Sequence, residues 1–166
     1  MSLKKSSSNP SIRPSAHNSG SIVRRAFLIE AIANLFTLPL LTHPHAILHY
    51  LLKYPSQINP STVFFARLFA GIIIAVLPTA LFAGYSNTRN GIESRRVIYL
   101  MLGAGEVVLI PTILREVMRA GGRDAAISAK VAAGSIMCLV PPLAWRIYVL
   151  FVRPEMMGSY TEMKRS

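Results

Sequence analysis

The sequence predicts an all-α protein, an antiparallel bundle of four transmembrane helices with a short interfacial helix between the first two. Four long apolar stretches carry this prediction, at about 23–42, 62–85, 97–114 and 128–152. Each approaches or exceeds the ~20 residues that a helix needs to cross a bilayer. The composition agrees, because only 15% of the residues are charged, against about 25% in a typical soluble domain.

The two chain ends are predicted to lie outside the four-helix transmembrane domain, which covers residues 23–153. Residues 1–22 are rich in serine and contain no acidic residue, so we expect a disordered basic tail. The same composition suits a cleaved mitochondrial transit segment, an alternative that the sequence leaves open. Residues 154–166 are expected to form a short polar C-terminal tail.

The first apolar stretch contains Pro39 near its far end, and a short amphipathic piece follows it from Pro44 to Tyr54. Prolines bound this piece, and its apolar residues gather on one side. These features predict a helix that lies in the membrane interface. Alternatively, the piece extends the first helix past a proline kink.

Helix-start and helix-stop signals delimit the remaining segments. Asn59 and Pro60 open the second segment, because asparagine caps free N–H groups and proline suits the first helical position. Residues 86–94 are polar and predict a turn before the third segment. Residues 119–124 contain two adjacent glycines, which predict the end of the third helix.

The positions of lysine and arginine predict the orientation in the membrane. Eleven of these residues fall on the side of the two tails and of the 85–96 turn, against five on the other side. Because cytoplasmic loops carry the excess of positive charge, we expect both termini in the cytoplasm or its topological equivalent. The eleven are Lys4, Lys5, Arg13, Arg24, Arg25, Arg89, Arg95, Arg96, Arg153, Lys164 and Arg165, and the five are Lys53, Arg115, Arg119, Arg123 and Lys130.

The net charge of +11 raises nucleic-acid binding as a rival interpretation. The distribution of charge argues against it, because the basic residues flank apolar runs and do not form one face with interleaved aromatic residues. The expected partner is therefore the lipid bilayer, and beyond it a larger membrane protein complex or further copies of the chain. The single cysteine, Cys138, lies in the fourth apolar run and is expected to pack as a small hydrophobic residue.

Four charged residues lie inside the apolar stretches, namely Glu30, Arg67, Glu106 and Arg146. Ionisable groups in hydrocarbon usually pair or face a bundle interior. At about 1.5 Å per residue, Glu30 and Arg146 lie roughly 8–9 Å from the same membrane face, and Glu106 lies near the midplane within reach of Arg67. We therefore predict two interhelical pairs, Glu30–Arg146 and Arg67–Glu106, with Asn34 one turn from Glu30 on the same face.

These two pairs have two possible roles. They can set the register of the helices, as buried polar groups do in some proteins. Alternatively, Glu30 or Glu106 carries a proton or anchors a ligand. Because the two acids and two bases cancel, the membrane interior is predicted to be neutral.

Sequence motifs for metal or nucleophilic chemistry are largely missing. His45 and His49 are one helical turn apart and form the only candidate metal pair, but neither a cysteine nor a carboxylate lies nearby to complete the site. The sequence contains no G-x-S-x-G, H-E-x-x-H or C-x-x-C motif and no phosphate-binding glycine loop. We therefore expect no metal site, no cofactor and no standard nucleophilic active site.

Three stretches carry a resemblance to known proteins: R-R with a glutamate and a late proline in the first helix, L-G-A-G-E at 102–106, and A-W-R-I-Y-V-L-F-V-R-P at 144–154. With them the chain resembles small four-helix membrane proteins of fungi that have no assigned function. In overall size and in the glutamate of its third helix it is also similar to DoxX-like four-helix proteins. Both resemblances imply a four-helix membrane fold, and neither implies catalytic residues.

These features favour a non-enzymatic accessory or assembly protein that docks on a larger membrane complex. Small-residue faces suited to helix packing support this interpretation. One alternative is a small transporter or proton-coupled carrier that uses Glu106 and Arg67. Another is a membrane-embedded enzyme that acts on a lipid or terpenoid, with a buried carboxylate as the acid.

Overall fold

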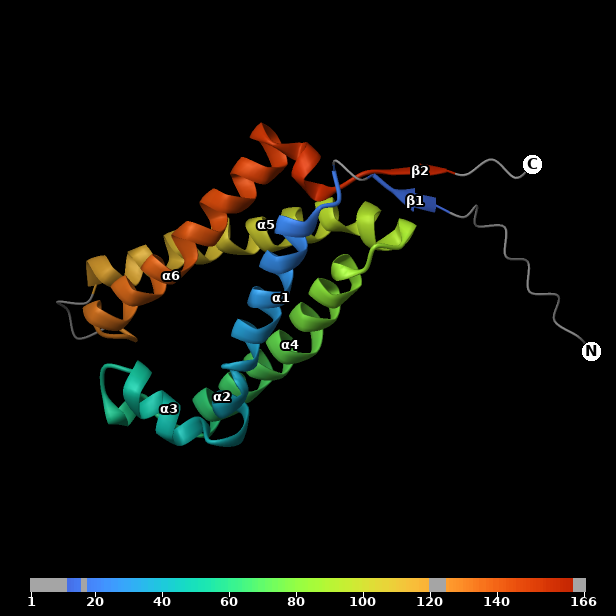
Figure 1. Cartoon of the computed structure of the whole chain (residues 1–166). Coiled ribbons are helices and arrows are strands. Elements are labelled where there is room, and N and C mark those ends of the chain that lie inside the picture. The colour runs from blue at the N-terminus through green and yellow to red at the C-terminus, as the bar shows by residue number, and fades with distance from the viewer. Residues whose placement is uncertain (1–11, 16–17, 120–124, 163–166) are drawn as a thin grey trace, which may run out of the picture.

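The computed structural model describes residues 12–15, 18–119 and 125–162, and most of these residues are helical (Figure 1). Four helical stretches are long and apolar enough to cross a membrane. The helical class and the four candidate spans predicted from the sequence are therefore confirmed. The spans are Ser21–Thr42, Pro60–Tyr85, Arg89–Arg119 and Ala129–Val152.

The first candidate span consists of two helices, α1 (Ser21–Leu35) and α2 (Leu38–Thr42). Between them, the N–H groups of residues 36 and 37 bond to carbonyls three residues back, both at 3.1 Å. Pro39 explains the break, because proline has no N–H group and its ring clashes with the carbonyl four residues earlier. The first helix therefore begins two residues before the predicted position and is interrupted near its far end.

A short helix, α3 (Pro44–Leu51), lies within the stretch 44–54 where the sequence predicted one, and the 3-10 turn η1 (Pro55–Gln57) follows it. Its location in the membrane interface stays a prediction. The segment between α3 and η1 is tied to the segment that precedes the last long helix. The main-chain N–H of Lys53 donates to the carbonyl of Ala126 at 3.0 Å. This contact holds the segment after α3 beside the start of the fourth span.

Two of the long helices begin with an N-terminal cap. In α4 (Pro60–Tyr85), the side chain of Asn59 accepts a hydrogen bond from Thr62 N–H at 3.0 Å, as the sequence predicted. In α6 (Ala129–Ile147), Ser128 accepts a bond from the N–H three residues later at 3.3 Å. Each cap satisfies one of the N–H groups that a helix start leaves without a partner.

The third long helix, α5 (Arg89–Arg119), begins earlier than the sequence predicted. Residues 89–94, most of the stretch 86–94 that was predicted as a connecting turn, form the first one and a half helical turns of α5. The hydroxyl of Thr88 accepts a bond from Gly91 N–H at 3.2 Å, and Arg89 pairs with Glu93 at 3.0 Å across one turn. These local contacts extend the helix through a stretch whose polar composition alone suggested a turn.

The two predicted tails meet each other in a small antiparallel sheet. β1 (Ile12–Pro14) pairs with β2 (Tyr160–Glu162), so both ends of the described chain lie at the same end of the molecule (Figure 1). Residues 12–14 and the start of α1 at Ser21 lie within the stretch 1–22 that was expected to be a disordered tail, and these residues are ordered in a strand and a helix. β2 lies within the short polar tail predicted over 154–166. Each strand has three residues, too few for an alternating pattern to show in the sequence, and its partner strand lies at the other end of the sequence.

Two short elements link α6 to β2. The chain continues from α6 into a π-helical turn, η2 (Tyr148–Val152), and then into the 3-10 turn η3 (Pro154–Met157). Pro154 ends the fourth span at the predicted position. Residues 1–11 and 163–166, the outer parts of both predicted tails, lie outside the described residues.

The predicted bundle is not confirmed, because the long helices form two pairs that diverge. α1 packs along α4, α6 packs along α5, and the contact between α4 and α5 joins the pairs. Figure 1 shows the pairs meeting near the chain ends and separating toward α3, which lies across the open end. The link from Lys53 to Ala126 spans this opening.

The apolar core sits where the helix pairs meet. Its members come from α1, α4, α5, η2 and η3, and Phe27 and Tyr99 are the largest aromatic residues among them. Their rings meet edge to face with centroids 4.9 Å apart. Gly84 of α4 lies against Phe27, and a Cβ atom built there would be 2.4 Å from that ring and 2.8 Å from Ile98.

We expect Gly84→Leu to lower the free energy of unfolding by about 1–3 kcal/mol, because the added side chain would overpack this core. Gly105→Leu is the matched control, since no atom lies within 4 Å of the added Cβ position there. Both changes put the same side chain into a helix that is long and apolar enough to cross a membrane. The measurement is detergent-induced unfolding followed by circular dichroism, and equal midpoints for the two variants would contradict the packing.

Candidate functional site

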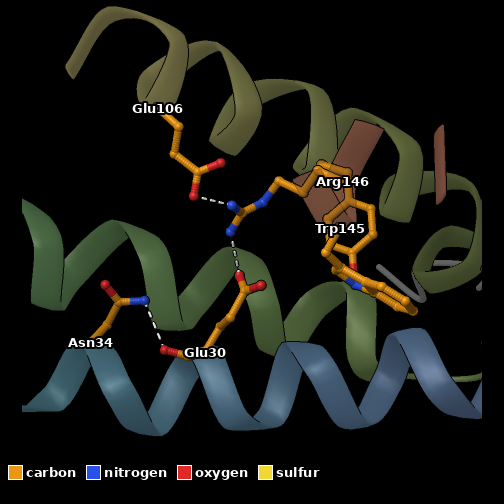
Figure 2. A network of polar contacts seen from close by, with 6 residues as sticks. Glu30, Asn34, Glu106, Trp145 and Arg146 are labelled. Atoms are coloured by element: carbon orange, nitrogen blue, oxygen red, sulfur yellow. Dashed lines mark hydrogen bonds and ion pairs between the residues drawn. The ribbon is translucent and has the colours of Figure 1, made fainter. Parts of the chain in front are cut away.

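A single buried arginine connects three helices. Arg146, near the end of α6, is 4% exposed and extends between α1 and α5 (Figure 2). Its Nη2 donates to Glu30 Oε2 at 2.7 Å, and its Nη1 donates to Glu106 Oε1. The fork of the guanidinium lets its two terminal nitrogens, Nη1 and Nη2, each bond to a different carboxylate. The Glu30–Arg146 pair predicted from helix depth is confirmed.

Glu106 has a different partner from the one the sequence predicted. It is 7% exposed and bonds to Arg146, so the predicted Arg67–Glu106 pair is wrong. Arg67 is exposed, and it has no ion-pair partner among the residues that the structure describes. Arg67 lies in the first turns of α4, where the helix pairs diverge. The residue that bonds to Glu106 of α5 is therefore Arg146 of α6.

The charge of this cluster differs from the neutral interior that the sequence predicted. One guanidinium faces two carboxylates, which gives a formal charge of +1 − 2 = −1 when both acids are ionised. Two buried atoms, Glu106 Oε2 and Arg146 Nε, have no hydrogen-bond partner within the described part of the chain. The cluster therefore holds buried charge with incomplete hydrogen bonding. Removal of either the guanidinium or a carboxylate is expected to lower the stability of the protein.

Aromatic and small residues enclose the arginine. The ring of Tyr99 lies 5.9 Å from Arg146 Cζ, and its hydroxyl accepts a bond from Trp145 Nε1 at 2.9 Å. Gly103 lies beside the arginine stem, and a Cβ atom there would make an ordinary contact, 3.9 Å from Arg146 Cδ. Gly103, Glu106 and Tyr99 lie on one face of α5, so this helix supplies a carboxylate, an aromatic wall and a small residue.

Asn34 is close to the cluster without joining the carboxylates. Its Nδ2 donates to the main-chain carbonyl of Glu30 at 2.8 Å, one turn back on α1 (Figure 2). The prediction that these two residues share a helix face is confirmed. The amide nevertheless satisfies the helix backbone, and the Glu30 carboxylate is held by Arg146 alone among the described residues.

A cavity of about 840 Å³ lies between the diverging helix pairs. Its wall is mostly apolar, and some of the side chains that line it are exposed, among them Met137 at 76%. Glu106 is one turn from Leu109, so the ionic cluster lies next to the cavity along α5. The cavity is lined by Tyr50, Leu51, Phe69, Leu109, Ile113, Lys130, Val131, Ala133, Gly134, Ser135, Met137, Cys138 and Leu139. Cys138 thus lines a cavity, where the sequence predicted simple packing.

The candidate metal pair is exposed on α3. His45 and His49 both lie on the helix surface. Across residues 12–15, 18–119 and 125–162, no three side chains of histidine, cysteine, aspartate or glutamate gather closely enough to hold a metal ion. His45 instead lines a second pocket, which also includes Arg67.

The buried role of Arg95 was not predicted from the sequence, in which Arg95 counts as one of the positive charges flanking the third span. Arg95 is 0% exposed and donates four hydrogen bonds where the chain ends meet the helices. The acceptors are Gly84 O at 2.8 Å, Ser86 O at 3.0 Å, Asn87 Oδ1 at 2.9 Å and Met157 O at 2.5 Å. The signal was the helical spacing, because Arg95 precedes Tyr99 by one turn and shares its buried face.

Two glycines permit this close approach to Arg95. Gly20 and Gly158 have positive φ angles of 66° and 90°, which favour glycine. A Cβ atom at either position would lie within 3 Å of Arg95 Nη1, at 2.3 Å and 2.7 Å. The guanidinium therefore bonds the end of α4 to η3, and it lies close against Gly20 at the start of α1.

Comparison with known proteins gives no family for this chain, because no protein-family model, no curated protein and no solved structure matches it. The resemblances to fungal four-helix membrane proteins and to DoxX-like proteins stay predictions.

Proposed function

We propose that this chain is a non-enzymatic, multi-pass accessory protein that receives a transmembrane helix of a partner membrane protein between its two helix pairs. The cavity of about 840 Å³ carries this proposal. A helix about 10 Å across that rises about 5.4 Å per turn occupies roughly 400 Å³ per turn. The cavity therefore matches about two turns of a helix.

The surface of the cavity suits a helix as its occupant. Ala133 and Gly134 present small side chains from α6, and no atom lies within 4 Å of a Cβ atom built at Gly134. Small residues let helix backbones approach closely in a membrane, where packing drives association. Met137 and Phe69 flank them with flexible and aromatic surface that a partner can bury.

The ionic cluster supports a structural role over the two alternatives. The carrier alternative required Glu106 to work with Arg67, but Glu106 bonds to Arg146. The enzyme alternative required a carboxylic acid facing a substrate. Glu30 and Glu106 are both bound to Arg146, and neither lines the cavity. The shared arginine thus favours a scaffold that sets the angle between the helix pairs.

Orientation and location belong to the same proposal. The pairing of β1 with β2 brings both chain ends to one end of the molecule. That end carries the larger share of lysine and arginine, so we place it in the cytoplasm or its topological equivalent. The partner helix then enters beside α3, from the opposite end.

The test is site-specific photocrosslinking in native membranes. A benzophenone amino acid at position 137, which lines the cavity, is expected to give an adduct with a second polypeptide. The same group at position 151 is the control, because Phe151 is 71% exposed and lies outside the cavity. Gly134→Leu should abolish the adduct at 137 by filling the small-residue surface, while the chain itself has room for the change.

The nature of the adduct decides the result. A protein adduct at 137 that is lost in Gly134→Leu supports the proposal. Lipid adducts alone, or a protein adduct that Gly134→Leu leaves unchanged, would contradict it. An adduct of twice the chain's mass of 18.2 kDa would show that the occupant of the cavity is a second copy of this chain and not a different protein.

A further inference from the structure

Arg67 is a charged residue within a membrane-spanning helix that the ionic cluster does not use. It lies seven residues after Pro60, about 10 Å into α4. It is exposed, and it forms no ion pair with any residue of the described ranges. Because an unpaired charge at such depth is costly in hydrocarbon, the guanidinium needs either water or an anion from outside the chain.

The surroundings of Arg67 favour an anion. It lines a pocket of about 390 Å³ together with His45 of α3 and Asn59, the cap of α4. The side-chain Oδ1 of Asn59 already accepts a bond from Thr62 N–H, so the side-chain N–H groups are the atoms left to bind a ligand. No carboxylate lines the pocket. A guanidinium, an amide and an imidazole together offer hydrogen-bond donors, and a guanidinium binds phosphate with two parallel bonds.

The same face of α4 also suits an acyl chain. Phe64, one turn before Arg67, lines the pocket and is 57% exposed. Gly71, one turn after Arg67, leaves open space, since no atom lies within 4 Å of a Cβ atom built there. We propose that this pocket binds the phosphate of an anionic phospholipid, with an acyl chain lying along α4 over Gly71. Long arginine side chains reach toward the headgroup level from such depths.

This lipid site is independent of the proposed helix-docking cavity. The two pockets have no lining residue in common. Each proposal can therefore fail while the other stands, and the variants that test one do not touch the other.

The test is native mass spectrometry of the full chain released from micelles that contain phosphatidylglycerol. Wild-type protein is expected to retain one phosphatidylglycerol molecule. Arg67→Gln should lower the bound fraction by about fivefold, which corresponds to the loss of one arginine contact near an anionic lipid. Arg115→Gln is the matched control, because Arg115 is also exposed, lies near the same end on α5 and does not line the pocket.

Two further arms separate a lipid from a soluble anion and from no ligand at all. Gly71→Leu keeps the charge but fills the open space over Gly71 where the acyl chain would lie, so this variant should also lose the lipid. Inorganic phosphate should not displace the bound phosphatidylglycerol. Equal retention in Arg67→Gln and Arg115→Gln would overturn the proposal, and so would displacement by inorganic phosphate or full retention in Gly71→Leu.

Discussion

Replacing Arg146 with methionine is expected to lower the free energy of unfolding by about 3–5 kcal/mol, the largest effect of any single change proposed for this chain. The change leaves the buried Glu106 and the half-buried Glu30 without the cation that both of them contact. It also removes the only side chain, among those described, that bonds to α1 and α5 at once. The measurement is unfolding in mixed micelles of increasing dodecyl sulfate content, followed by circular dichroism.

A charge-neutral triple variant separates charge from packing. Adding Glu30→Gln and Glu106→Gln to Arg146→Met removes the uncompensated charge and keeps the side-chain volumes similar, so most of the lost stability should return. Arg25→Gln serves as the control for loss of a positive charge, because Arg25 is exposed at the start of α1. A triple variant as unstable as Arg146→Met would show that the arginine acts through packing and not through charge.

Replacing Arg95 with methionine is expected to lower the free energy of unfolding by about 2–4 kcal/mol, because four oxygen acceptors lose a buried charged donor at once. Three of these acceptors belong to residues 84–87 at the end of α4 and just after it, and one is Met157 O in η3. Arg95→Lys should also be destabilising, since a single ammonium group cannot reproduce the fork of a guanidinium. The measurement is the same micellar unfolding transition.

The loss of Arg95 should also expose the C-terminal segment. A protease that cleaves after glutamate should cut Arg95→Met faster at Glu155, because η3 is no longer held to α5. Arg96→Gln is the control, since Arg96 is the exposed neighbour in the same arginine pair. Equal cleavage rates in the two variants would contradict the role of Arg95 in holding the chain ends to the helices.

Hydropathy and cap chemistry predicted the helices of this protein well, for a physical reason. A segment in hydrocarbon must satisfy its own backbone, so a long apolar run is nearly always a helix. Asn59 and Pro60 marked the start of α4, because an asparagine side chain caps free N–H groups and proline is preferred at the first position of a helix. The tilt between helix pairs has no comparable signal, because it depends on contacts between surfaces far apart in the sequence.

The candidate site was predicted in part, and the residues explain why. Depth along a helix follows from residue number, and it correctly matched Glu30 with Arg146. Arg67 had a suitable depth and lies one turn from buried Val63 and buried Ala70, yet α4 diverges from α5 at that end. Arg95 was misread because a basic residue at a helix start normally faces water, and its acceptors are mostly main-chain oxygens without any sequence signature.

The partner of Glu30 lies in the last membrane helix, which has a consequence for biosynthesis. Glu30 and Arg146 are 116 positions apart. At roughly 5–20 residues per second, the ribosome takes on the order of ten seconds to make the intervening chain. If α1 enters the membrane within this interval, its Glu30 carboxylate does so before Arg146 has been made. We therefore expect α1 to need an environment that shields or neutralises this carboxylate until α6 follows.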